Sequence, residues 1–127
     1  MNNPNNPCIF CSIRKNELIF ENNFAYASSD SYPVSKFHSL VVPKRCIKNY
    51  FELNDEEVLA CNDLIKKLKQ KIISEDDTVK GFNIGTNVGT AAGQSVFHCH
   101  IHVIPRREGD VKNPQGGVRS VIPSKQH

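Results

Sequence analysis

The feature that most constrains the fold is a histidine-bearing segment, "SVFHCHIHVIPR", at residues 95–106. Successive side chains of a β-strand point to opposite faces of the sheet, so this alternating pattern predicts a strand with two unlike faces. The predicted chemical face carries His98, His100 and His102. The predicted core face carries Phe97, Cys99, Ile101 and Val103. Three of the chain's five histidines lie on one face, which favours a metal site or a reaction centre over simple packing.

Three further segments predict additional strands. β-branched and aromatic residues in 18–22 and 24–29 predict a hairpin, with "ENN" as its turn. Residues 37–45 predict a strand that ends at Pro43, because proline cannot donate to a central ladder. Residues 79–89 predict a strand that reaches the histidine segment through the glycine-containing turn "TNVGTAAGQ".

One long helix is predicted over residues 53–75. Asn54 or Asp55 can cap it, and acidic residues fill its first turn. The apolar residues at helical spacing are Val58, Leu59, Cys61, Leu64, Ile65, Leu68 and Ile72. With a short helical turn in "CIFCSIRKNE", the order of elements predicts an α+β fold: about five antiparallel strands, one long helix and one short helix.

Length and composition limit the classes of function. A chain of 127 residues suits one domain, which we expect over residues 8–127 after a disordered Asn/Pro-rich tail at 1–7. The net charge of +3 is spread along the chain, which argues against a nucleic-acid partner. No stretch approaches a membrane span and no signal peptide is recognisable, so we expect no membrane partner and a cytoplasmic protein.

The five cysteines, without a secretion signal, indicate reduced thiols or metal ligands. Cys8 and Cys11 form a C-x-x-C pair, which is half of a structural zinc site. Cys61 and Cys99 are interpreted as small buried hydrophobic residues.

"GQSVFHCHIHVIPR" resembles the signature of the histidine triad (HIT) family of nucleotide hydrolases and transferases, in which three histidines alternate with apolar residues. "YPVSKFHSLVVPKR" resembles the family's upstream strand, loop and strand, and "CIFC" resembles the opening of its zinc-containing members. The resemblance covers most of residues 8–107 and implies a HIT-like fold.

The resemblance implies a catalytic role for three histidines. His100 matches the middle histidine, which attacks the α-phosphorus of a nucleotide and forms a nucleotidyl-histidine intermediate. Imidazole suits this role if its other ring nitrogen is held by a hydrogen bond, for which a backbone carbonyl of the strand is available. His102 matches the histidine that contacts phosphate and assists the leaving group, with a spacer role as the alternative. His38 matches a histidine that lies beside the triad and supports it.

Four residues match nucleotide-contacting positions of the family. Gln94 and Ser95 match contacts to the phosphate or to the leaving-group oxygen. Asn87 matches a phosphate-side amide, with an ordinary turn residue as the alternative. Asp30 matches the residue that accepts hydrogen bonds from the ribose hydroxyls, with a turn-forming aspartate as the alternative.

The resemblance also completes the zinc site. Zinc-containing members take a third ligand from a histidine after "PK+" and a fourth from the first triad histidine; this chain has Cys46 at the former position. The implied ligands are Cys8, Cys11, Cys46 and His98, a closed set of structural type.

The resemblance therefore implies a nucleotide hydrolase that binds a small purine nucleotide and a structural Zn²⁺ ion, and it implies a homodimer because family members are typically homodimeric. "PRREGD" after the triad resembles the dinucleoside polyphosphate branch of the family, which favours diadenosine polyphosphates as substrates. A purine nucleoside phosphoramidase is the alternative enzyme. A zinc-stabilised nucleotide-binding or sensing module is the alternative that is not an enzyme.

Overall fold

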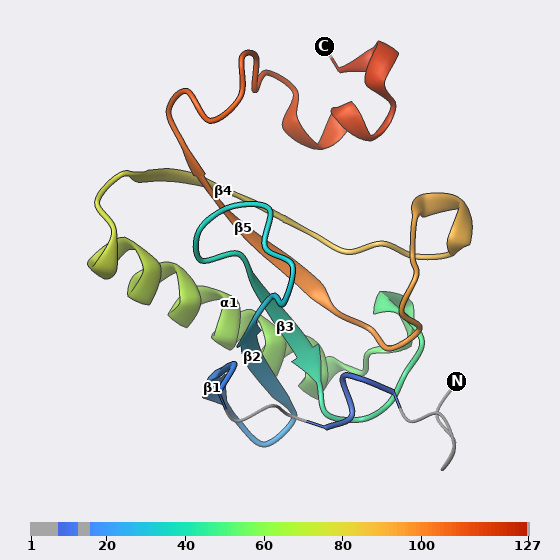
Figure 1. The fold of residues 1–127 in the computed structure, drawn as a ribbon. Coiled ribbons are helices and arrows are strands. Elements are labelled where there is room, and N and C mark those ends of the chain that lie inside the picture. Colours follow the sequence, from blue (N-terminus) through green and yellow to red (C-terminus); the bar gives the residue numbers. More distant parts are fainter. Residues whose placement is uncertain (1–7, 13–15, 127) are drawn as a thin grey trace.

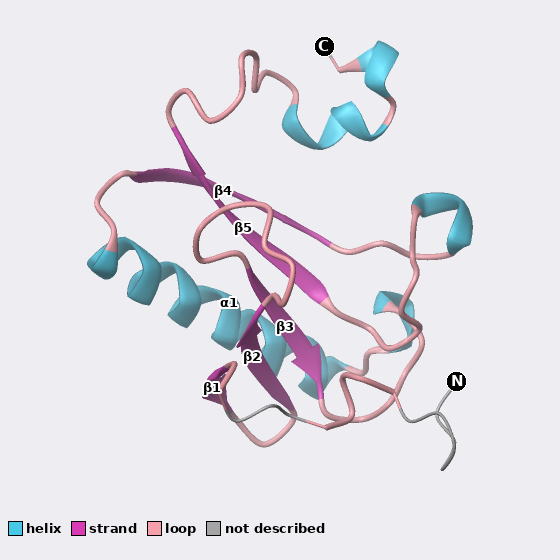
Figure 2. Cartoon of the chain, in the orientation of Figure 1, coloured by secondary structure: helices cyan, strands magenta, loops and turns pink. Residues whose placement is uncertain are grey.

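The computed structural model describes residues 8–12 and 16–126, which form one antiparallel sheet with a long helix against one face (Figures 1 and 2). The strands are β1 (Leu18–Glu21), β2 (Ala25–Ser29), β3 (Ser39–Pro43), β4 (Val79–Gly85) and β5 (Ile101–Arg107). Their order across the sheet is β1-β2-β3-β5-β4, and every neighbouring pair is antiparallel. The predicted α+β class, the five-stranded sheet and the hairpin over residues 18–29 are confirmed.

The long helix, α1 (Asp55–Glu75), begins with a reciprocal cap. The Asn54 side chain accepts from the Glu57 N–H, and the Glu57 side chain accepts from the Asn54 N–H, both at 2.9 Å. Glu57 is buried and also accepts two hydrogen bonds from Arg45, at 2.9 and 2.8 Å. This cap ties the segment that follows β3 to the start of α1.

The apolar stripe of α1 differs from the predicted one in its first turn. The buried side chains are Glu57, Cys61, Leu64, Leu68 and Ile72. Val58 and Leu59, predicted to be apolar contacts, are instead 38% and 69% exposed. At about 100° per residue they lie off the stripe that faces the sheet.

The two faces of the sheet bury different clusters. Ala25, Ala27, Val41, Ile101 and Val103 pack with α1 in the larger cluster. Tyr26, Leu40 and Val42 belong to a smaller cluster that also includes Phe10 and Leu18. Because strand side chains alternate, the second cluster and His102 lie on the sheet face away from α1. This face carries the candidate site.

The histidine segment is a strand only in its second half. β5 begins at Ile101, so residues 95–100 lie outside it, contrary to the prediction of one continuous strand. These residues are held by the segment that follows β3: the Cys99 N–H donates to the Ile47 carbonyl at 2.8 Å. His98 is fully buried there, and its ring still lies on the same side as His100, because the Phe10 ring contacts both.

The chain ends are made of turns and short helices. Residues 8–12 form a turn, with a 3.2 Å bond from Cys11 N–H to the Cys8 carbonyl; the predicted short helical turn over residues 8–17 also includes residues 13–15, which lie outside the described range. The short helices that are described are 3-10 turns at Tyr50–Glu52, Thr90–Ala92, Gly117–Val121 and Pro123–Lys125. The predicted tail at 1–7 lies outside the described residues. Among the helices described, none is long and apolar enough to cross a membrane.

Candidate active site and metal cluster

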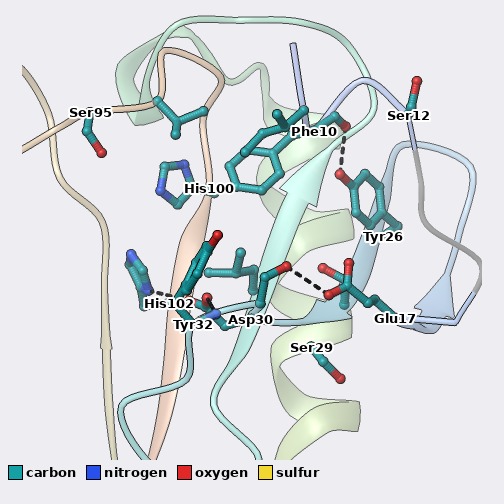
Figure 3. Close-up of a pocket in the computed structure, with 15 residues that line it drawn as sticks. Phe10, Ser12, Glu17, Tyr26, Ser29, Asp30, Tyr32, Ser95, His100 and His102 are labelled. Atoms are coloured by element: carbon teal, nitrogen blue, oxygen red, sulfur yellow. Dashed lines mark hydrogen bonds and ion pairs between the residues drawn. The ribbon is translucent and has the colours of Figure 1, made fainter.

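A pocket of about 440 Å³ opens on the sheet face away from α1 (Figure 3). His100, His102 and Ser95 line one part of it, and Asp30 lies between them and Glu17 in the view. Its volume falls within the range of small-ligand sites. The fold thus brings four of the predicted catalytic and nucleotide-contacting residues, His100, His102, Asp30 and Ser95, to one cavity.

His100 is held in one orientation by the backbone before it. Its Nδ1 lies 2.8 Å from the His98 carbonyl oxygen. A carbonyl only accepts, so Nδ1 carries the proton and Nε2 keeps a lone pair. The Phe10 ring packs beside the imidazole, with centroids 4.9 Å apart. The expected hydrogen bond to a backbone carbonyl is confirmed, and it leaves a lone pair on Nε2 of His100.

His102 receives the opposite proton arrangement through a chain of hydrogen bonds. The Val34 N–H donates to His38 Nδ1 at 3.1 Å, so the proton of the neutral His38 ring sits on Nε2. His38 Nε2 lies 2.9 Å from His102 Nδ1 and 3.2 Å from Asp30 Oδ2. His102 Nδ1 accepts in this chain, and its own proton is therefore on Nε2. One triad ring offers a lone pair and the next offers a donor.

Burial favours the neutral form of the His38 and His102 rings. Desolvation lowers the pKa of His38, against the opposing effect of the Asp30 carboxylate. Desolvation also lowers the pKa of His102, helped by His100 and His38 and opposed by Asp30. Neutral rings preserve the alternation of donor and acceptor described above.

Two predicted nucleotide contacts are not brought to the pocket. Gln94 is buried, and its side chain is occupied by the Gly89 N–H and by the carbonyls of Lys48 and Val96, at 2.7 to 3.1 Å. These hydrogen bonds hold the loop before the triad. Asn87 is exposed between β4 and the Thr90–Ala92 turn and does not line the pocket.

A second cluster lies behind His100. Cys8, Cys11, Cys46 and His98 place one ligand atom each within 4.8 Å of all the others. His98 Nε2 lies 2.8 Å from the Pro43 carbonyl, so Nε2 carries the proton. Its Nδ1 faces the sulfurs of Cys8 at 3.3 Å and Cys11 at 3.5 Å. A lone pair on Nδ1 and a carbonyl partner on Nε2 are what a metal-ligating histidine requires, so the residues fit a metal ion.

Sequence reasoning missed several residues of the pocket, among them Phe10, Glu17 and Ser31. Phe10 packs against His100, and its carbonyl accepts from the Tyr26 hydroxyl at 2.6 Å. Its position between the cysteines of the C-x-x-C pair was the available signal. Glu17 and Ser31 also line the pocket and are joined by a 2.8 Å hydrogen bond. Both flank the predicted hairpin, whose register brings them together.

The model of the HIT domain matches residues 13–109, well over half of the chain. The chain belongs to the HIT family. Among its relatives, the adenosine 5′-monophosphoramidase hnt1 of Schizosaccharomyces pombe is 36% identical over 78% of this chain and 74% of its own length. The adenylylsulfatase HINT3 of Arabidopsis thaliana is 34% identical over 83% of this chain and 55% of its own length.

Solved structures agree with this assignment and with the fold. A hypothetical histidine triad nucleotide-binding protein from Sulfolobus tokodaii has a TM-score of 0.71 at 37% identity, over 81% of this chain and 71% of its own. A zinc-bound histidine triad family protein from Mycobacterium smegmatis has a TM-score of 0.74 at 31% identity, over 84% and 79%. The HIT-like fold expected from the triad motif is confirmed.

Proposed function

We propose that this HIT protein hydrolyses purine nucleotides at the α-phosphorus, with His100 as the nucleophile. The observation that carries the proposal is the bond from His100 Nδ1 to the His98 carbonyl, which leaves the Nε2 lone pair available in the pocket. A pure binding module would not need this arrangement. We therefore favour an enzyme over a sensing module.

The proposed reaction has two displacements. First, His100 Nε2 bonds to phosphorus and the bond from phosphorus to the leaving group breaks; His102 Nε2–H donates a hydrogen bond to the leaving atom, which takes up a proton from solvent. Water then attacks phosphorus, the bond to His100 breaks, and the water releases a proton to solvent. His38 keeps His102 Nδ1 as the acceptor in the resting state. Asp30 is proposed to accept from the ribose hydroxyls, and Ser95 to donate to the phosphate.

For the leaving group, the contacts favour a small one. The names of the two enzyme relatives describe a phosphoramidase and an adenylylsulfatase. Diadenosine polyphosphates were favoured by "PRREGD", but Arg106 is paired with Asp110 at 2.7 Å and Arg107 with Asp76 at 3.0 Å. Neither arginine lines the pocket. We therefore propose nucleoside phosphoramidates first and dinucleoside polyphosphates second.

Zn²⁺ is the proposed occupant of Cys8, Cys11, Cys46 and His98. The zinc-bound relative from M. smegmatis and the tautomer of His98 support it. Four protein ligands leave no open position for water, so the ion would be structural and would fix the N-terminal turn beside the triad. Cys46 takes the place of the histidine that zinc-containing relatives are expected to use.

A homodimer is the proposed assembly. β4 is at the end of the sheet, and within the described chain it pairs only with β5. Ile84 on this strand is 49% exposed, and the C-terminal segment exposes further apolar side chains, namely Val118, Val121 and Ile122. A second copy would cover this edge and its apolar neighbours.

The test supplies adenosine phosphoramidate and diadenosine tetraphosphate separately to the wild type and to His100→Asn, and follows AMP release. We expect turnover by the wild type and a loss of at least about a thousandfold in the variant. His127→Asn, the same change at the one histidine without an assigned role, is the matched control and should retain full activity. Nucleotide binding without turnover by the wild type would instead support a sensing module.

A further inference from the structure

The hydrogen bond of His100 does not by itself fix the direction of its ring. The bond from Nδ1 to the His98 carbonyl, at 2.8 Å, decides which nitrogen carries the proton. Carbonyl oxygens accept over a broad range of directions, and the torsion that turns a histidine ring about its Cβ–Cγ bond has broad minima. The Nε2 lone pair lies in the plane of the ring, so its aim depends on that torsion. A second contact is needed to fix the plane.

Phe10 supplies this second contact. Its ring lies beside the His100 imidazole, with centroids 4.9 Å apart and planes inclined at 54°. It also meets the His98 ring edge to face, with centroids 6.1 Å apart. Both separations are typical of aromatic pairs in contact. Figure 3 shows Phe10 and His102 in different directions from the His100 ring, so Phe10 limits its rotation on a side that His102 leaves open.

Phe10 is itself fixed by its backbone. Its N–H donates to the Cys8 Sγ at 3.3 Å, and its carbonyl accepts from the Tyr26 hydroxyl at 2.6 Å. Tyr26 is buried in β2, and Phe10 packs against the same small cluster on the sheet face that carries the pocket. The Phe10 ring is therefore anchored to the sheet without the help of a ligand.

We propose that Phe10 is a positioning residue, whose ring holds the His100 imidazole so that the Nε2 lone pair points at the α-phosphorus. The inference rests on the proposed function, because it concerns the first displacement of that reaction. Leucine at position 10 would keep apolar contact with the cluster but would lose the flat ring beside His100. Since a misplacement of about 1 Å can lower a rate about 100-fold, we expect Phe10→Leu to slow the first displacement by roughly 10- to 100-fold.

Phe10 also lines the pocket, so a role in binding the nucleotide has to be separated from a role in positioning His100. The two roles change different quantities. A positioning residue acts on the rate when substrate is fully bound, whereas a residue that only packs against the nucleotide acts on affinity.

The test compares the wild type, Phe10→Leu and Phe10→Tyr in single-turnover reactions on adenosine phosphoramidate, with enzyme in saturating excess. The rate of substrate consumption then reports the first displacement. It should fall roughly 10- to 100-fold in Phe10→Leu and stay within about threefold of the wild type in Phe10→Tyr, which keeps the ring. Titration calorimetry should give an affinity for AMP within about threefold of the wild type in both variants.

Phe51→Leu is the matched control, because Phe51 is 80% exposed and does not line the pocket. Its rate and its affinity for AMP should equal those of the wild type. A wild-type rate in Phe10→Leu, or equal slowing in Phe10→Leu and Phe10→Tyr, would overturn the inference alone. A wild type that does not consume the substrate would overturn the proposed function instead.

Tyr26→Phe tests the same link if thermal unfolding shows that Phe10→Leu is not folded. This change keeps the Phe10 ring and removes the hydroxyl that holds the Phe10 carbonyl. The first displacement should slow by about two- to tenfold, which is the usual worth of one hydrogen bond. An unchanged rate would overturn the inference.

Discussion

Two clusters of potential metal ligands lie on either side of His100, and they differ in what they can hold. Cys8, Cys11, Cys46 and His98 form one, and Asp30, His38 and His102 form the other. In both clusters the ligand atoms lie within 4.8 Å of one another. Distance alone therefore does not separate a metal site from a proton chain.

The two clusters differ in the hydrogen bond made by the ring nitrogen that faces away from the cluster, in His98 and in His38. His98 donates from Nε2 to the Pro43 carbonyl, which leaves Nδ1 free to bind a metal. His38 accepts from the Val34 N–H at Nδ1, so its proton sits on the nitrogen that faces Asp30 and His102. A protonated nitrogen cannot bind a metal. The hydrogen bonds to the Pro43 carbonyl and from the Val34 N–H thus support the proposed zinc site at one cluster and the proposed catalytic role of the other.

The largest expected effect tests the metal side of this comparison. Protein purified without chelator should contain one zinc per chain, and Cys46→Ala should contain less than half of one. Cys46→His should restore it, because histidine can take the same ligand position. The loss of zinc should lower the free energy of unfolding by several kcal/mol, because structural zinc contributes folding energy. Metal analysis and denaturant titration check both.

Cys61→Ala is the control for that experiment, since Cys61 is buried against the sheet and belongs to neither cluster. A second tightly bound zinc, removed by His38→Gln and not by Cys46→Ala, would contradict the assignment of the Asp30 cluster.

A smaller effect tests the catalytic side. His38→Gln should lower kcat by roughly 10- to 100-fold with little change in KM, because His102 loses the partner that keeps its Nε2 protonated. Steady-state kinetics on adenosine phosphoramidate measure the split. Ser120→Ala, in the C-terminal segment, is the control. A rise in KM alone would show that His38 shapes the binding of nucleotide and has no influence on His102.

The smallest expected effect concerns pH and stability. Burial lowers the pKa of His38 and His102 in the folded protein, with Asp30 opposing and His100 adding to the effect at His102. Below the ordinary histidine pKa of about 6.5, the unfolded chain binds protons that the folded protein does not, so stability falls as pH falls. Thermal unfolding of the zinc-loaded protein between pH 7.5 and 5.5 should show this loss. The loss of stability should be smaller in His38→Gln than in the wild type. If both proteins lose stability equally as the pH falls, the loss does not come from His38 and His102.

The sequence predicts the sheet and helix well, because strand alternation and helical periodicity are local properties. Through the family resemblance, the sequence also places Cys46 and His98 in the same cluster, although they are 52 residues apart in the chain. The prediction from sequence fails where a backbone group far away in the sequence determines the local structure. Residues 95–100 resemble a strand, but Ile47 and Pro43 hold them instead. Gln94 stays a predicted phosphate contact, and its amide is held by the Lys48 carbonyl and the Gly89 N–H in this structure. The tautomers depend on carbonyls and amides that every residue carries, so no motif could reveal them.

The most direct measurement is the position of the ring protons, from long-range ¹H–¹⁵N correlation NMR of the histidine rings in the zinc-loaded protein near pH 7.5. The account predicts a proton on Nδ1 of His100 and on Nε2 of His38, His98 and His102. Asn substitutions of the individual histidines assign the signals. A proton on Nε2 of His100, or on Nδ1 of His38, would contradict the division of the two clusters and the identity of the nucleophilic atom.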